Sequence, residues 1–418
     1  MSQENQTLAA TDAAPSVSRR RFIAGAGAAA ATISLVDARL AFASTANSKI
    51  NLGIIGCGGR GTWIAKLFQQ HGGYNLVAAA DYFADRVDAL GDALGVKPAQ
   101  RFTGLSGYRR LLEQPLDAVA IISPPYYHPE QAAAAVAAGR HVYVAKPIAV
   151  DVPGCRTIEQ SGQKATEKKR CFLVDFQTRA DPFYIEALQR VHGGAIGKFA
   201  FGEASYHAEN PFGQHMDALR KDSQSPEVRL RAWGLDRVLS GDIITEQNIH
   251  TLDVASWIMD QPPLCAFGTG ARKVRDAGTC CDTFSLVFLY PDNVGITFSS
   301  RQIEGHGTQP AGIRNRMFGA EGVLETAYGG QVLIRGKHFW HGGKSPQIYR
   351  DGAVSNIAAF HASIQKGDFG NPTVAPSVRS TLVTILGRTA AYGGQIVHWD
   401  QLLKSSERLD PELKGLKS

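Results

Sequence analysis

The sequence predicts an α/β protein built in two different ways: an N-terminal doubly wound parallel sheet, then a C-terminal α+β part with an open, mostly antiparallel sheet. Two observations support this. Short apolar strands alternate with helix patterns through the first half of the chain, which is typical of a parallel sheet. From about residue 198, strand patterns follow one another through turns without helices of crossover length, which indicates antiparallel pairing.

The first strand, Ile50–Ile55, leads into the glycine-rich segment "GCGGRG" and then an amphipathic helix pattern. In this strand-turn-helix setting, the glycines permit a tight turn, close approach to a pyrophosphate, and close packing of helix on strand. The helix N-terminus would face the anion. We therefore predict a dinucleotide site, with contacts from Gly56, Gly58, Gly59, Arg60 and Gly61.

A second apolar run ends at Asp81, twenty residues beyond Gly61. A carboxylate at this position can accept hydrogen bonds from both hydroxyls of the adenosine ribose. It favours NAD over NADP, because it would repel a 2′-phosphate, although Arg60 and Arg86 leave NADP open. Further strands are predicted at residues 116–123, 140–147 and 171–176, with helices after Pro129 and Pro153.

The second half has strand patterns at residues 198–207, 265–274, 282–303, 312–327 and 330–336, with a turn at Pro291-Asp292-Asn293. One helix pattern, residues 244–259, interrupts them. On a continuous helix, Glu246, His250 and Asp253 would share one face. That stripe is open to three interpretations: a solvated polar face, a metal site, or an acid/base group oriented by a neighbouring acid.

The N-terminus "SRRRFIAGAGAAAATISLV" has the order of a twin-arginine export signal. Arg19-Arg20 precede Phe22 and a weakly apolar run, and Ala41-Phe42-Ala43 matches a small-residue cleavage site. The alternative is a disordered, alanine-rich tail. We predict removal of residues 1–43 and export of the folded chain, through the twin-arginine machinery, to the periplasm or the exterior. No later apolar run is long enough to span a bilayer, so we expect no stable membrane insertion after cleavage.

The formal charge is +6, of which about +5 remains after residue 43 because that segment holds four Arg against three acidic residues. This excess is spread along the chain without basic blocks, which argues against nucleic-acid binding. The six cysteines show no C-x-x-C spacing. We expect buried free thiols, with one disulfide possible, and no metal site.

Five motifs in order resemble the glucose-fructose oxidoreductase/inositol dehydrogenase/MocA family across nearly the whole chain after the leader. They are the glycine turn, the acid Asp81, the segment Ser123-Pro124-Pro125-Tyr126-Tyr127-His128, the segment Ala145-Lys146-Pro147, and Glu246 four residues before His250. The resemblance implies a Rossmann domain followed by a domain with an open sheet. The chain departs from the family pattern at Ala145, Pro125 and Glu246, where the family has Glu, Asn and Asp.

The resemblance implies that Lys146 reaches the reacting oxygen of the substrate, and that His250, steered by Glu246, moves a proton to or from a sugar hydroxyl. Histidine is the side chain that titrates near neutral pH, and an ammonium group stabilises developing alkoxide charge. The implied further cofactor contacts are Ser123, Pro124, His128 and Lys146. Candidates for the substrate pocket are Tyr126, Gln177, Arg179 and Asp253.

These features predict an NAD(P)-dependent oxidoreductase for a sugar or cyclitol, with a tightly held cofactor because it must be loaded before export. Two alternatives stay open: an NAD-dependent glycosidase that oxidises C3 transiently, and a non-catalytic sugar-binding relative. We predict a signal peptide (1–43), a Rossmann domain (48–175), a substrate and oligomerisation domain (176–370), and a C-terminal helix and tail (371–418) that packs back on the Rossmann domain. The open sheet favours a homodimer or homotetramer.

Overall fold

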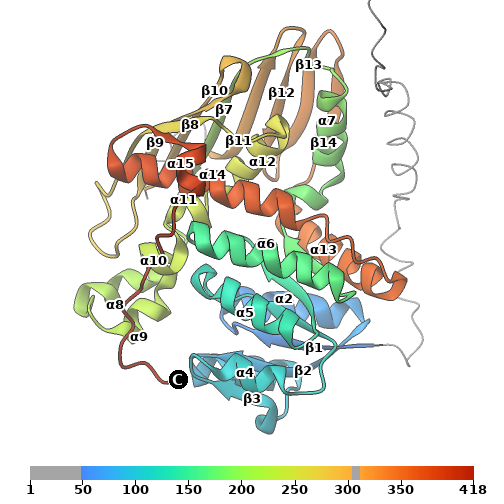
Figure 1. The fold of residues 1–418 in the computed structure, drawn as a ribbon, viewed down its shortest axis with the longest axis vertical. Coiled ribbons are helices and arrows are strands. Elements are labelled where there is room, and N and C mark those ends of the chain that lie inside the picture. Colours follow the sequence, from blue (N-terminus) through green and yellow to red (C-terminus); the bar gives the residue numbers. More distant parts are fainter. Residues whose placement is uncertain (1–48, 304–310) are drawn as a thin grey trace, which may run out of the picture. The chain divides into compact units, whose positions relative to one another are not determined.

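The computed structural model describes residues 49–303 and 311–418 (Figure 1). All of these belong to one compact unit, residues 45–418. The predicted export signal and its cleavage site lie outside the described residues.

The first sheet has six parallel strands in the order β3-β2-β1-β4-β5-β6, so the predicted doubly wound parallel sheet is confirmed, with a short strand β3 that was not predicted. They are β1 (Ile50–Ile55), β2 (Tyr74–Asp81), β3 (Arg101–Thr103), β4 (Ala118–Ile121), β5 (His141–Ala145) and β6 (Phe172–Asp175). The connecting helices are α2 (Gly59–His71), α3 (Ala84–Leu94), α4 (Gly107–Leu112), α5 (His128–Ala137) and α6 (Val152–Glu167). The strand order reverses between β1 and β4, which is where ligands bind in open sheets of this kind.

The second sheet has nine strands in the order β14-β13-β12-β11-β7-β10-β9-β8-β15. The strands are β7 (Phe199–Ala208), β8 (Cys265–Ala271), β9 (Thr283–Tyr290), β10 (Val294–Gln302), β11 (Gly312–Gly319), β12 (Gly322–Ala327), β13 (Gln331–Gly336), β14 (Trp340–Lys344) and β15 (Val397–His398). Among the described residues of this sheet, only β7 and β10 pair in parallel, so the predicted, mostly antiparallel sheet is confirmed. The predicted turn at Pro291–Asn293 joins β9 to β10.

Long helices cover one face of the second sheet (Figure 1): α7 (Pro182–His192), α12 (Ile249–Met259) and α14 (Val374–Gly393). Strand β9 alternates accordingly, with Phe284, Leu286 and Phe288 buried against the helices. Helix α13 (Ile348–Lys366) packs against α2, and α14 also packs against α6. These contacts join the two sheets into one body, while the predicted domain boundaries themselves stay a prediction.

The continuous helix predicted over residues 244–259 is wrong. The structure has two helices, α11 (Ile243–Glu246) and α12, separated at Gln247-Asn248. Without a continuous helix, the spacing no longer places Glu246 on the face of His250 and Asp253, which both lie on α12. The sequence pattern of apolar residues runs on through the break, because both helices are buried.

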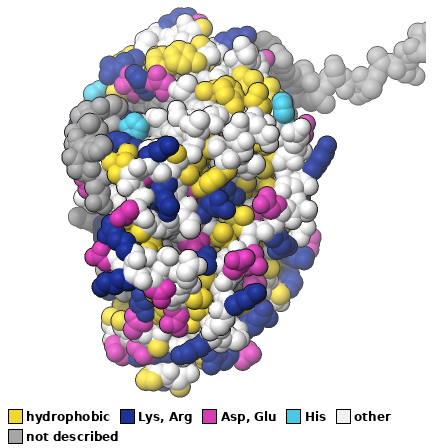
Figure 2. All heavy atoms as spheres, turned by 90° about the vertical axis from the view of Figure 1, so that its left-hand side faces the viewer, with side chains coloured by type: hydrophobic (Ala, Val, Ile, Leu, Met, Phe, Trp, Pro, Cys, Tyr) yellow, Lys and Arg dark blue, Asp and Glu magenta, His cyan; other side chains and the backbone are white. Residues whose placement is uncertain are grey.

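Between β7 and α11 the chain forms three short helices, α8 (Met216–Lys221), α9 (Pro226–Arg231) and α10 (Arg237–Ser240). The chain ends with α15 (Trp399–Leu403) and an extended tail. In Figure 1 the tail runs down past α10 towards the first sheet, and Figure 2 shows acidic and basic side chains interspersed over the described part of the face it views.

All six cysteines are buried and free, as predicted. Within the described residues, no helix combines the length and the apolar character needed to cross a bilayer.

Candidate active site

The glycine turn has the backbone that the motif requires. Gly56 has φ +93°, and a Cβ there would lie 2.5 Å from the backbone nitrogen of Ser123. A Cβ on Gly61 would lie 1.8 Å from the carbonyl oxygen of Gly56. By contrast, a Cβ on Gly59 would meet nothing within 4 Å, and α2 begins there without a side-chain cap. The first two glycines allow the close packing, and the helix N-terminus stays open towards an anion.

Asp81 lies where the sequence places it, at the end of β2 next to the glycine turn. Its carboxylate accepts hydrogen bonds from the backbone nitrogens of Cys57 (2.7 Å) and Phe83 (3.0 Å). Burial raises the pKa of Asp81, and these two N–H groups oppose that shift. The two bonds fix the carboxylate in one orientation and leave further acceptor capacity on its oxygens.

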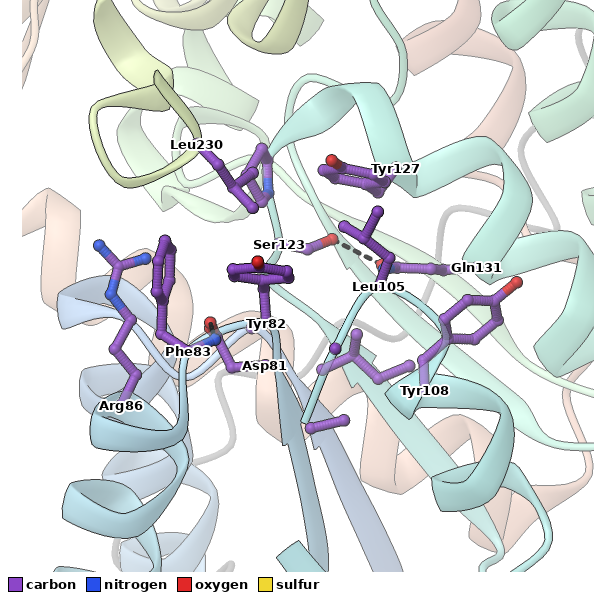
Figure 3. Close-up of a pocket in the computed structure, with 15 residues that line it drawn as sticks. Asp81, Tyr82, Phe83, Arg86, Leu105, Tyr108, Ser123, Tyr127, Gln131 and Leu230 are labelled. Carbon is purple, nitrogen blue, oxygen red and sulfur yellow. Dashed lines mark hydrogen bonds between the residues drawn. The ribbon is translucent and has the colours of Figure 1, made fainter. Parts of the chain in front are cut away.

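A pocket opens beside Asp81, between the ends of β1, β2 and β4 (Figure 3). Of the predicted cofactor contacts, Gly56, Asp81, Ser123 and Pro124 line it. Ser123 donates a hydrogen bond to Oε1 of Gln131 at 2.6 Å. In doubly wound sheets, a dinucleotide binds at such a strand-order reversal, so this pocket fits its adenosine half.

Sequence reasoning missed most of the apolar lining of this pocket. Tyr82, Phe83, Leu105, Tyr108 and Leu230 all contribute. The aromatic pair directly after Asp81 was a usable signal. Leu230 was not predictable, because it comes from α9, far along the chain, and reaches the pocket only through the tertiary fold (Figure 3).

Lys146 directly follows β5, at the carboxyl edge of the parallel sheet. Its Nζ donates to the backbone oxygen of Glu246 at 2.6 Å and lies 3.3 Å from Oε1 of the same residue. Burial lowers the pKa of Lys146, and the Glu246 carboxylate opposes the shift. The contact brings together two of the predicted catalytic residues, one from each half of the chain.

His250, on α12, is buried, and its Nδ1 has no hydrogen-bond partner. Burial, then the positive charges of Lys146 and Arg60, lower the pKa of His250 well below its usual value, so the ring is neutral at about pH 7. The steering of His250 by Glu246 is not seen. The Glu246 side chain instead accepts bonds from Lys146 and Gln247.

The Arg60 side chain lies near Lys146 and His250, because its positive charge acts on the pKa of both. Its guanidinium forms an ion pair with Asp175 (2.5 Å), at the end of β6, and donates to the hydroxyl of Tyr349 (2.6 Å) on α13. Burial alone would lower the pKa of Arg60, but Asp175 and Tyr349 outweigh it and raise the pKa. The Arg60 side chain therefore joins α2 to β6 and to α13, rather than standing free for a phosphate.

His128 is also fully engaged within the protein. Its ring nitrogens lie 2.8 Å from the carbonyl oxygen of Pro147 and 2.7 Å from that of Ser123. Burial lowers the pKa of His128 to about 4. The residue thus ties the segment of Ser123 to that of Lys146, so it orders the site and does not line the pocket.

The predicted substrate residues separate into different places. Arg179 and Asp253 form a bidentate ion pair with each other (2.8–3.0 Å), and Ser380 donates to the same carboxylate. Both side chains are therefore engaged with each other within the protein, although Asp253 lies three residues from His250 on the same helix α12. Tyr126 packs against Tyr127, in the apolar cluster beside the adenosine pocket.

Gln177 does lie next to the charged residues. It is fully buried, and its Nε2 donates to Asp175 at 3.1 Å, while its Oε1 has no partner. The hydroxyl of Tyr328, whose ring lies 5.4 Å from that of His250, is likewise without a partner. Buried polar atoms left unpaired are costly, and three gathered in one region indicate a place prepared for a polar ligand.

The open glycine turn, the fixed carboxylate of Asp81 and the unpaired polar atoms near Lys146 together fit a dinucleotide whose adenosine end lies at Asp81 and whose other end lies at Lys146. The fold and this site define a dinucleotide-binding α/β protein. The described residues contain no group of three or more His, Cys, Asp or Glu suited to a metal ion.

Comparison with known proteins agrees with this class. The model of the oxidoreductase family with an NAD-binding Rossmann fold matches residues 50–176, and that of the GFO/IDH/MocA C-terminal domain matches residues 184–325. Together the two models cover more than half of the chain. The protein therefore belongs to the Gfo/Idh/MocA oxidoreductase family, and its first sheet is an NAD-binding Rossmann fold.

The chain is 24% identical over 355 residues to the myo-inositol 2-dehydrogenase of Thermotoga maritima, covering 82% of this chain and 95% of that protein. It is 28% identical over 162 residues to glycosyl hydrolase family 109 protein 3 of Phocaeicola vulgatus, covering 38% of this chain and 29% of that protein. The structure of levoglucosan dehydrogenase in complex with NADH and levoglucosan shares the fold, with a TM-score of 0.66 at 16% identity, over 84% of this chain and all of that one.

Proposed function

We propose that the protein is an NAD-dependent oxidoreductase that exchanges hydride with a hydroxyl or ketone of a sugar or cyclitol. One observation carries the proposal: Lys146, at the carboxyl edge of the Rossmann sheet, is close enough to His250 for its positive charge to lower the pKa of the imidazole, and Nδ1 of His250 is buried and unbonded. The inositol dehydrogenase from Thermotoga maritima, similar over most of both chains, supports the same substrate class.

Bound NAD would supply the hydride acceptor; the protein supplies the proton transfer and the charge. Because its pKa is lowered, His250 is neutral, and Nδ1 can accept the hydroxyl proton of the substrate. The Lys146 ammonium can stabilise the negative charge that develops on the same oxygen. The carbonyl and carboxylate of Glu246 hold that ammonium in place.

The charges at the site favour an uncharged substrate. Lys146 is paired with Glu246, and Arg60 with Asp175. Neither cation stands unneutralised for a substrate carboxylate, which would have to compete with a buried acid of the protein. We therefore expect neutral polyols to be turned over in preference to sugar acids.

The test is the near-ultraviolet absorbance of reduced nicotinamide. With NAD bound, addition of neutral sugars and inositols to the purified protein should produce the absorbance with at least one of them. The variant His250→Gln should bind NAD and lose the response. No absorbance change with any neutral polyol, despite bound NAD, would contradict the proposal.

A glycosidase that oxidises its sugar transiently is the second candidate, supported by the similarity to glycosyl hydrolase family 109 protein 3. It would release a chromogenic aglycone without net reduction of NAD. A non-catalytic sugar-binding protein, for which Ala145 in place of the family's Glu is the motivation, would do neither. Nicotinamide absorbance and aglycone release, measured together, therefore distinguish the oxidoreductase, the glycosidase and the sugar-binding protein.

We also propose that the chain is exported folded, with its cofactor retained, and assembles as a homodimer or homotetramer. The order of Arg19-Arg20, Phe22 and Ala41–Ala43 supports export. Cell fractionation with Arg19→Lys/Arg20→Lys as the matched variant should show loss from the periplasm, and light scattering should give the assembly. Equal export of the variant would contradict the twin-arginine route.

A further inference from the structure

The adenosine pocket is bordered by a helix from outside the Rossmann sheet. Leu230 on α9 lines the pocket opposite Asp81 (Figure 3) and is 4% exposed. Arg231 next to it forms a bidentate ion pair with Asp85 on α3 (2.9 Å for both bonds), and its guanidinium lies 3.9 Å from the ring centre of Phe83. Helix α9 is thus fixed to the Rossmann domain on the rim of the pocket.

The C-terminal tail fixes a second wall. The backbone oxygen of Lys417 accepts a hydrogen bond from the nitrogen of Leu105 at 3.0 Å, and the hydroxyls of Ser418 and Ser106 lie 3.2 Å apart. Leu105 itself lines the pocket. The last residues of the chain therefore hold the loop that forms this side of the adenosine site.

The two segments meet at Tyr82, the residue after Asp81. Its hydroxyl donates to Glu227 on α9 at 2.8 Å and accepts from the nitrogen of Lys417 at 3.4 Å. Leu413 and Leu416 of the tail pack against the apolar cluster that contains Leu230. Residues separated by nearly the whole chain are joined around one pocket.

We propose that α9 and residues 413–418, here called the clasp, complete the adenosine subsite and hold the dinucleotide between turnovers. This inference rests on the dinucleotide binding of the proposed function. An adenosine between Asp81 and Leu230 leaves when an ion pair, three tail hydrogen bonds and apolar contacts open together. Such coupled opening lowers the rate at which the bound dinucleotide dissociates.

The test is the release of NADH, followed by its fluorescence when excess NAD is added to the NADH-loaded full chain. Deletion of residues 413–418 should speed release by about tenfold or more. Arg231→Ala, which removes the ion pair at the surface, should also speed it. Lys404→Ala is the matched control, because that side chain is exposed in the C-terminal segment before the clasp, and it should release NADH at the rate of the full chain.

Release within twofold of the full chain in both Arg231→Ala and the deletion would overturn the clasp. If the deletion fails to fold, Arg231→Ala and Leu416→Ala decide by the same criterion. The readout does not depend on a sugar. Loss of the proposed function alone would appear as normal NADH release without any turnover, whereas failure of NADH to bind would overturn both.

Discussion

The two ends of the dinucleotide site are built differently. At the Lys146 end, charged side chains from both halves of the chain are paired inside the protein, and one imidazole nitrogen is left unbonded. At the Asp81 end, the walls are mainly apolar and come partly from α9 and from a loop held by the tail. The first arrangement suits chemistry and the second suits retention, so changes at the two ends should affect different measurements.

The largest effect is expected from His250→Gln at the chemical end. The amide keeps much of the size but cannot take the substrate proton, so kcat should fall by about a thousandfold. Binding of NADH, measured by fluorescence, should stay within about twofold of the parent. The exposed His398→Gln is the control. A variant of residue 250 with normal kcat would remove the imidazole from the mechanism.

Lys146→Met should lower kcat by about a hundredfold, because one positive donor to the developing alkoxide is lost. Steady-state kinetics checks this, with the exposed Lys164→Met on α6 as control. The effect should appear in kcat more than in the KM for the polyol. An increase of KM alone would place Lys146 in binding and not in chemistry.

Asp253→Asn tests whether the other acid near His250 is structural. Removing its charge leaves Arg179 unpaired, which should cost about 3 kcal/mol of unfolding free energy in urea. The folded fraction should keep its kcat. Glu186→Ala, in a surface pair with Arg190, should cost only about 0.5 kcal/mol. A loss of kcat with unchanged stability would return Asp253 to the substrate pocket.

Asp81→Ala should act on binding at the other end. Without the carboxylate that accepts hydrogen bonds from the ribose, the affinity for NADH should fall by about tenfold in a fluorescence titration. The preference for NADH over NADPH should become smaller. The exposed Asp88→Ala on α3 serves as control. If the affinities for both cofactors are unchanged, the carboxylate does not contact the ribose.

The smallest effect is in the pH profile. The reaction needs neutral His250, and its pKa is lowered below 6.5, so protonation removes activity only well below that pH. The oxidation rate should therefore change little between about pH 7.5 and pH 6. At about pH 6, a histidine with an unperturbed pKa would already be mostly protonated. If the oxidation rate falls by half near pH 6.5, and this fall is absent in His250→Gln, then the pKa of His250 is not lowered and the prediction is wrong.

The nucleotide half of the site could be predicted from the sequence, because it depends on the backbone conformation of short segments. Gly56 needs a positive φ, Gly61 lies against the Gly56 carbonyl, and Asp81 ends a strand. The same holds for Lys146, which follows a strand in a recognisable segment. Features that depend only on the backbone conformation of a short segment are the same in the sequence prediction and in the folded protein.

The contacts that depend on tertiary structure could not be predicted from the sequence. The break at Gln247-Asn248 separates Glu246 from Asp253, and each acid finds a different cation. A helical spacing rule cannot show such a break inside a continuous apolar run. Leu230 and the tail reach the pocket only by chain folding, so no local pattern marks them.

The most direct test of the account is a single turnover with a polyol carrying deuterium on the carbon that is oxidised. The account predicts that the NADH recovered from the protein is one mass unit heavier, because the hydride moves directly to the cofactor held between Asp81 and Lys146. Unlabelled NADH formed from a labelled, consumed polyol would contradict it.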